Sequence, residues 1–148
     1  MKTSAKKPKK KSRSAAVPLG GVDYQALLQH GARRVRPQDL TAVARHARAI
    51  QSMAQGLAGL HPQLAARVRL LVDLVSDYQR RRYRKVSVRI IHAATYALLY
   101  FLSPNDVVPD QIPLVGFGDD AAIIGLVFYL AEQDLEDYSS WKGVAYPG

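Results

Sequence analysis

The chain has 148 residues, of which 48% are hydrophobic and 22% are charged, and its formal net charge is +9. This length suits one domain, and the apolar content is too high for a chain that is disordered throughout. The absence of cysteine excludes disulfide scaffolds, thiol catalysis and cysteine-ligated zinc. The uncharged runs stop short of about 18 residues, so the sequence predicts no ordinary transmembrane helix.

Positive charge is concentrated in the first part of the chain. Residues 1–14 contain seven Lys and Arg and no acid, whereas residues 90–148 contain eight acids and one Lys. We expect residues 1–21 to form a disordered tail, because repulsion between like charges opposes compaction. The tail has no apolar segment of a secretory signal. It is either a solvated tail or a contact for an anionic partner through Lys6, Lys7, Lys9, Lys10 and Lys11.

Residues 22–69 are predicted to form an N-terminal helical region. Asp23 is a suitable N-cap for a first helix, which we expect to end at Gly31 in a left-handed cap. Pro37 suits the first turn of a second helix, whose apolar face continues in steps of three and four to Leu57. A third helix carries an apolar stripe formed by Leu64, Val68, Leu71, Val75 and Tyr78. These stripes indicate the core of a helical bundle.

A dense run of cations precedes the most apolar part of the chain. We call it the basic collar, and it consists of Arg80, Arg81, Arg82, Arg84, Lys85 and Arg89. Residues 90–102 carry no formal charge and predict a helix about 20 Å long, short of the roughly 30 Å hydrocarbon core of a bilayer. A second apolar helix is predicted over 121–131. Asp119 and Asp120 precede it, where the helix macrodipole favours negative charge.

The connection between these two apolar helices is rich in proline and aspartate. Ser103, Pro104 and Asp106 resemble a capping box with proline in the first turn. Pro109 and Asp110 end that turn. Pro113 favours extended backbone before it, and Gly116 favours a tight turn after it. We therefore expect a helical hairpin around an Asp/Pro-rich hinge.

Three arrangements of this hairpin remain open. It can pack against the preceding helices in a soluble bundle. It can enter a bilayer with the collar on the cytoplasmic side, although ionised aspartates in the hydrocarbon would oppose insertion by about 2.5–3.5 kcal/mol each. Alternatively, Asp106, Asp110, Asp119 and Asp120 can converge on a divalent cation, although their spacing matches no calcium loop.

No catalytic constellation is recognisable in the sequence. The four histidines lack zinc-helix spacing, and we find neither a Gly-rich phosphate loop nor a nucleophile with its base. His92, Tyr96 and Tyr100 follow one another at one-turn spacing, which indicates packing with a polar edge rather than a proton relay. We therefore predict a protein that is not an enzyme and needs no cofactor.

Residues 70–142 resemble the YkvA family, whose domain is named DUF1232. The resemblance rests on a Tyr–Ser–Pro–Asp–Pro–Asp–Pro–Gly–Asp–Asp pattern, although Gln111 and Gly118 stand where apolar residues are usual. The matching positions are Tyr100, Ser103, Pro104, Asp106, Pro109, Asp110, Pro113, Gly116, Asp119 and Asp120. The family has no defined activity, and the resemblance implies membrane association with no catalytic residues to carry over. We expect a structural role for these positions.

The overall expectation is an all-α protein, a small helical bundle with an apolar hairpin, preceded by a disordered basic tail. Its parts would be the tail (1–21), the N-terminal helices (22–69), the hairpin domain (70–142) and a C-terminal tail (143–148). The leading functional hypothesis is a non-enzymatic protein that is held at the bacterial inner membrane by the apolar hairpin, assisted by the basic tail and collar, with its basic N-terminus cytoplasmic. The alternatives are a soluble helical interaction module, or nucleic-acid binding through the tail, the collar and Arg33, Arg34 and Arg36.

Overall fold

The computed structural model describes residues 22–102 and 118–148, and every regular element in these ranges is helical. The elements are α1 (Tyr24–Arg33), α2 (Pro37–Arg45), α3 (Ala47–Leu57), α4 (Pro62–Gln79), α5 (Val88–Leu102), α6 (Gly118–Leu130) and α7 (Glu132–Lys142). The all-α prediction is confirmed for these ranges. The predicted tail, at 1–21, and residues 103–117 of the hinge lie outside them.

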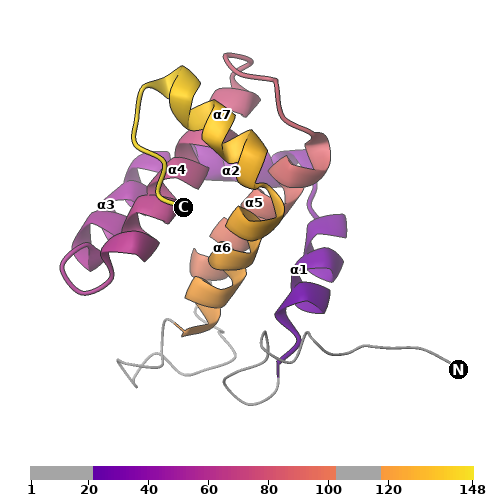
Figure 1. Cartoon of the computed structure of the whole chain (residues 1–148). Helices are drawn as coiled ribbons and strands as arrows, with labels where there is room; N and C mark the ends of the chain where they lie inside the picture. Colours follow the sequence, from indigo (N-terminus) through magenta and orange to yellow (C-terminus); the bar gives the residue numbers. More distant parts are fainter. Residues whose placement is uncertain (1–21, 103–117) are drawn as a thin grey trace, which may run out of the picture.

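Helix α5 lies in the middle of the bundle (Figure 1). It packs against α1, α2, α4 and α6, while α3 packs along α4 and α7 follows α6. All seven of the described helices contribute side chains to one continuous hydrophobic core. Fully buried members such as Leu71, Leu98 and Ile123 each contribute about 1.5–3 kcal/mol to stability.

The two apolar helices of the predicted hairpin are inside this core. In α5, Ile91 and Leu98 are fully buried, and in α6 Ile123 is fully buried and Phe128 nearly so. Both α5 and α6 contact α1 and α4, so the packing of these helices against the preceding ones, which the first of the three arrangements requires, is observed in the described ranges. None of the described helices combines the length and the hydropathy needed to cross a bilayer.

Several helix boundaries agree with the local sequence. The Asp23 carboxylate accepts a hydrogen bond from the Ala26 N–H (3.1 Å) and caps α1 as predicted. Pro37 and Pro62 occupy the first turns of α2 and α4, where a missing N–H costs nothing. Helix α7 was not predicted by the sequence, because its apolar positions are few.

Gly31 does not end α1, contrary to the sequence-based expectation. The helix continues to Arg33, and Gly31 faces the Tyr96 ring of α5. A Cβ at this position would lie 2.1 Å from Cε1 of Tyr96, far inside van der Waals contact. The glycine therefore serves helix packing rather than helix termination.

The second predicted helix is interrupted at His46. The apolar periodicity runs unbroken to Leu57, but the backbone at His46 (φ −101°, ψ 17°) leaves the helical region and separates α2 from α3. The His46 imidazole Nδ1 lies 3.0 Å from the Ala42 carbonyl oxygen, a local contact that the periodicity does not reveal. The bend lets α3 pack along α4, where Gln51 donates to the Asp73 carboxylate (2.6 Å).

The expected boundary between residues 69 and 70 falls inside α4. Helices on both sides of it share the same core, since α1 packs on α5 and α6 while α2 and α3 pack on α4. The N-terminal helices and the hairpin are therefore joined by one buried cluster.

Candidate functional site

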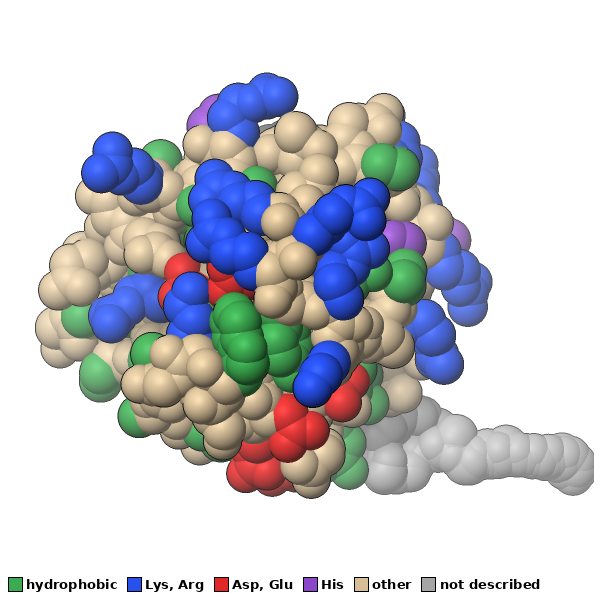
Figure 2. Space-filling model, turned by 90° about the horizontal axis from the view of Figure 1, so that it is seen from above, with side chains coloured by type: hydrophobic (Ala, Val, Ile, Leu, Met, Phe, Trp, Pro, Cys, Tyr) green, Lys and Arg blue, Asp and Glu red, His purple; other side chains and the backbone are tan. Residues whose placement is uncertain are grey.

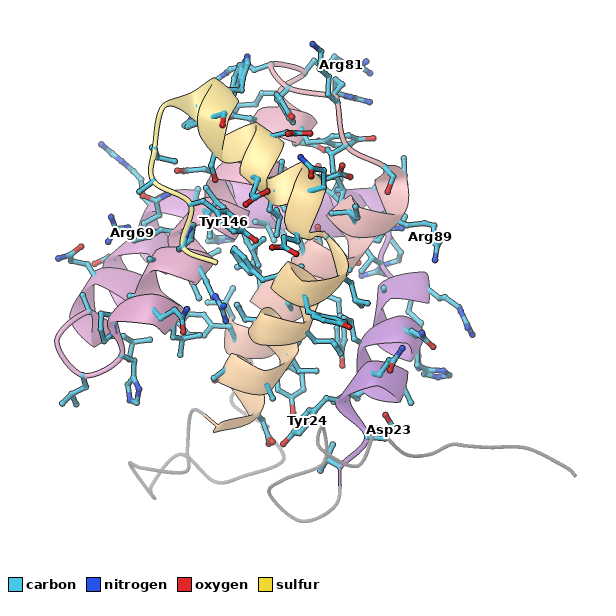
Figure 3. The ribbon with its side chains drawn as sticks, in the orientation of Figure 1. Asp23, Tyr24, Arg69, Arg81, Arg89 and Tyr146 are labelled. Atoms are coloured by element: carbon cyan, nitrogen blue, oxygen red, sulfur yellow. The ribbon has the colours of Figure 1, made fainter. Side chains whose placement is uncertain are left out.

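The residues that the sequence singles out occupy opposite ends of the bundle. The basic collar spans the end of α4, the connection to α5 and the start of α5, at the end of the molecule where Figure 3 places Arg81. Asp119 and Asp120 lie in the first turn of α6, at the end where Figure 3 places Tyr24.

Helix α4 ends in a turn that places the collar outward. The Arg82 N–H donates to the Asp77 carbonyl (2.8 Å), and the Arg81 N–H donates to the Tyr78 carbonyl (3.1 Å). This is the Schellman pattern, in which the residue after the cap adopts a left-handed backbone and is usually glycine. Here that residue is Arg81, with φ of 64°, and it is the one non-glycine residue with positive φ in the described ranges. A cation therefore occupies a position that favours glycine.

The Asp77 carboxylate fixes the collar to α7. Its side chain is only 3% exposed, and it accepts hydrogen bonds from the Tyr138 hydroxyl (2.6 Å) and the Lys142 ammonium (2.9 Å). Arg82 of the collar lies 3.3 Å from its other oxygen. Two cations and a hydroxyl thus offset the cost of burying one negative charge. Burial, together with the hydrogen bond to Asp77, raises the pKa of Tyr138 far above its ordinary value.

An aromatic cluster lies beside Asp77 and extends to the surface. The Tyr83 ring centroid is 5.0 Å from those of both Tyr138 and Trp141, and the Tyr138 and Trp141 rings are 5.9 Å apart. Tyr83 is 5% exposed, whereas Trp141 is 51% exposed. The outer member of the cluster therefore presents half of an indole ring to solvent next to the collar.

All six collar residues are exposed. Arg82 pairs with Asp77, and the Arg84 guanidinium lies over the Tyr78 ring at 4.1 Å. The remaining collar cations have no ion-pair partner in the described part of the chain: Arg80, Arg81, Lys85 and Arg89. Figure 2, which views this end from above, shows Lys and Arg side chains gathered around a hydrophobic patch, with acidic side chains on two sides of the patch.

The opposite end of the bundle holds a second buried carboxylate. Asp119 is fully buried, Asp120 is 1% exposed, and the Tyr24 hydroxyl at the start of α1 donates to the Asp119 carboxylate. Figure 3 shows Tyr24 reaching towards the base of α6. Burial, and then the bond to Asp119, raise the pKa of Tyr24 above its usual range. The prediction that both aspartates lie at the positive end of an apolar helix is confirmed.

The described ranges contain three of the ten signature residues. Tyr100, Asp119 and Asp120 are described, and Tyr100 is half-buried on α5. The other signature residues lie outside the described ranges: Ser103, Pro104, Asp106, Pro109, Asp110, Pro113 and Gly116. In residues 22–102 and 118–148, no group of three acidic or histidine side chains is arranged to hold a metal ion. The tail lysines Lys6, Lys7, Lys9, Lys10 and Lys11 also lie outside.

The row His92, Tyr96 and Tyr100 is a packed surface with a polar edge. All three side chains are half-buried, and the Tyr96 and Tyr100 rings lie 6.0 Å apart. Tyr96 also covers Gly31 of α1. The row therefore forms part of the contact between α1 and α5, as the spacing indicated.

The sequence analysis assigned no role to two residues of these sites. Asp77 continues the apolar spacing of Leu70 and Leu74, and an acid on a buried helix face is a signal that a partner is needed. Lys142 is the single Lys or Arg after position 89, which made it a candidate partner for such an acid. The pairing of Tyr24 with Asp119 spans 95 positions and leaves no comparable sequence signal.

Comparisons with known proteins agree with the resemblance seen in the sequence. Residues 92–126 match the family model DUF1232, described as a protein of unknown function. The chain is 35% identical over 70 residues to a protein of Bacillus subtilis (strain 168) named "Uncharacterized membrane protein YkvA". That alignment covers 47% of this chain and 66% of the relative, slightly less than two thirds of its length. No solved structure matches the chain.

Proposed function

Because the chain carries a segment of the YkvA/DUF1232 family, we propose that it is a non-enzymatic, membrane-associated protein that binds anionic headgroups through the basic collar. The observation that carries this proposal is the exposed collar beside Trp141. The indole ring of Trp141 is half exposed to solvent and half packed against the protein, as is typical of tryptophan at membrane interfaces. The cations next to it attract acidic lipids. The name of the Bacillus relative supports the same location.

The collar, rather than the hairpin, makes the contact in this proposal. The faces of α5 and α6 that would meet lipid tails are already buried against α1 and α4. Each Lys or Arg near an anionic bilayer contributes about 1 kcal/mol, and the attraction weakens as salt rises. The collar and the N-terminal tail together provide enough cations for reversible attachment without insertion.

Trp141 is the only tryptophan of the chain and therefore reports on this contact directly. We expect its fluorescence to shift to shorter wavelength when the full chain is mixed with phosphatidylglycerol vesicles, and not with phosphatidylcholine vesicles. High salt should reverse the shift. Vesicle binding without a change at Trp141 would show that another face makes the contact, and no binding would overturn the proposal.

A triple variant tests the charge requirement. Arg80→Gln, Arg81→Gln and Lys85→Gln together remove three cations that have no ion pair in the described ranges, and we expect vesicle affinity to fall about a hundredfold. The matched control carries Arg45→Gln, Arg48→Gln and Arg69→Gln, which remove equal charge from exposed positions on α2, α3 and α4. Equal losses in the two variants would contradict a collar-specific contact.

The same variants separate membrane binding from nucleic-acid binding. Affinity for a short DNA duplex or a single-stranded RNA is measured in a vesicle-free titration over a range of salt concentrations. Salt-dependent nucleic-acid binding that is lost with the collar, combined with no binding to anionic vesicles, would replace the membrane proposal with the nucleic-acid alternative.

A further inference from the structure

A groove of about 550 Å³ lies between α1, α5 and α6. It is formed by the second half of α1, the start of α5 and the end of α6, on the flank where Figure 3 places Arg89. This volume is within the range of roughly 300–1,000 Å³ that is typical of small-molecule sites. None of the residues used so far for the membrane contact lines the groove, except Arg89.

The bottom and walls of the groove are apolar. Leu28, Val127 and Ala131 are buried beneath it, and Ile90 and Ala93 of α5 line it at intermediate depth. The apolar lining continues to Leu130, which is 52% exposed at the end of α6. No Phe, Tyr or Trp side chain lines the groove, and the imidazole of His92 is the only ring among the described residues that line it. The lining suits a flexible alkyl chain.

Two guanidinium groups from different helices stand on the rim of the groove. Arg33 is the last residue of α1 and Arg89 is the second residue of α5, and both are exposed. Neither has an ion-pair partner among the residues that the structure describes. Polar groups of Gln29, Ser87 and His92 complete the rim. Two unpaired arginines beside an apolar groove are complementary to an anionic headgroup attached to an alkyl chain.

We propose that this groove binds a single-chain anionic amphiphile, with the alkyl chain along Leu28 and Val127 and the headgroup between Arg33 and Arg89. The site goes beyond the proposed membrane contact, because it accepts a monomeric ligand in solution whether or not the collar binds vesicles. A carboxylate or a phosphate headgroup satisfies the two arginines equally, so fatty acids and single-chain phospholipids share the required chemistry.

The test uses the full chain and 11-(dansylamino)undecanoic acid, below the concentration at which it forms micelles. We expect saturable binding that enhances the dansyl fluorescence. Dodecanoate and a lysophosphatidic acid should both displace the probe, and their relative affinities identify the preferred headgroup. Dodecanol has the chain without the charge and should compete much more weakly. The absence of saturable binding would overturn the proposal, as would equal displacement by dodecanol.

Two variants address the two halves of the site. The double substitution Arg33→Gln and Arg89→Gln alters exposed side chains, so it should leave the fold intact while weakening probe binding about tenfold or more. Arg48→Gln, an equally exposed arginine on α3, is the charge control. Ala93→Phe should fill the groove and abolish binding, with Ala49→Phe as the exposed control, and thermal unfolding confirms that each variant is folded.

The outcomes distinguish this site from the proposed function. The collar variant with Arg80→Gln, Arg81→Gln and Lys85→Gln should lose vesicle binding but bind the probe normally, because none of the three residues lines the groove. Conversely, Ala93→Phe should lose the probe and keep the vesicle-dependent shift of Trp141. Unchanged probe affinity in both the double arginine variant and Ala93→Phe would show that the probe binds elsewhere and would refute the groove.

Discussion

Each end of the bundle holds a buried aspartate that accepts a hydrogen bond from a tyrosine hydroxyl. At the collar end, Asp77 of α4 bonds to Tyr138 of α7 and also pairs with two cations. At the opposite end, Asp119 bonds to Tyr24 of α1 and lies in the first turn of α6. One carboxylate is offset by side-chain charge and the other lies in the field of a helix N-terminus. The two buried carboxylates are thus stabilised by different surroundings at the two ends of the bundle.

The largest effect is expected from removing the collar-end carboxylate. Asp77→Ala leaves Lys142, Arg82 and the Tyr138 hydroxyl without their shared acceptor, so the free energy of unfolding should fall by about 3–5 kcal/mol. Urea denaturation followed by circular dichroism measures the change. Asp137→Ala removes an exposed carboxylate from the same helix as Tyr138 and should cost less than about 0.5 kcal/mol. A similar cost for both variants would contradict the assigned role of Asp77.

Removing each tyrosine hydroxyl in turn compares how much the hydrogen bond at each end of the bundle contributes to stability. Tyr24→Phe removes the hydroxyl that bonds to Asp119 and should lower the free energy of unfolding by about 1.5–3 kcal/mol. Tyr138→Phe should cost only about 1 kcal/mol, because Asp77 keeps both of its cations. The two variants are compared in one set of urea titrations. If Tyr138→Phe proved the more costly, the cations would not be compensating Asp77 as inferred.

Alkaline pH should lower the free energy of unfolding through the buried tyrosines at both ends of the bundle. Burial and the neighbouring aspartates raise the pKa of Tyr24 and of Tyr138, so the folded protein retains these protons when the unfolded chain releases them. Their stabilising contribution is complete below pH of about 10 and decreases above it, by about 1.4 kcal/mol per pH unit for each tyrosine. Stability measured between neutral pH and pH 11 should show this slope. Either Phe variant should reduce it, whereas Tyr129→Phe, at an exposed position, should not.

The smallest effect, and one of opposite sign, is expected at Arg81. Glycine adopts a left-handed backbone without the steric cost that a Cβ brings. Arg81→Gly should therefore raise the free energy of unfolding by about 0.5–1 kcal/mol. Arg80→Gly, at the preceding residue with φ of −88°, should instead lower it by a similar amount. Thermal unfolding of both variants measures the difference. If Arg81→Gly is more stable and also binds vesicles more weakly, then the cation at position 81 contributes to binding and lowers the stability of the fold.

Local sequence signals predicted helix starts better than helix ends or bends. Asp23 and Pro37 act within their own first turns, so the residue type is sufficient to locate the boundary. Gly31 and His46 could not be interpreted in this way. The first is required by a ring on another helix, and the second marks a bend that a continuous apolar stripe conceals.

The candidate sites differ in how far apart their residues lie in the sequence. The basic collar lies within ten consecutive residues, so its cations can be recognised from the sequence, and all six are exposed. The placement of Asp119 at a helix N-terminus follows from its neighbours. The groove could not be predicted, because Arg33 and Arg89 meet across it only when α1 packs beside α5. Tyr24 and Asp119 likewise become partners through tertiary packing alone.

The position of Tyr24 determines how the molecule would be oriented on a flat surface. The basic residues 1–21 join the described chain at Val22, two positions before Tyr24, at the end of the bundle remote from Arg81 (Figure 3). A membrane that contacted the collar alone would therefore leave Asp23 and Tyr24 at the end of the bundle that points away from the bilayer.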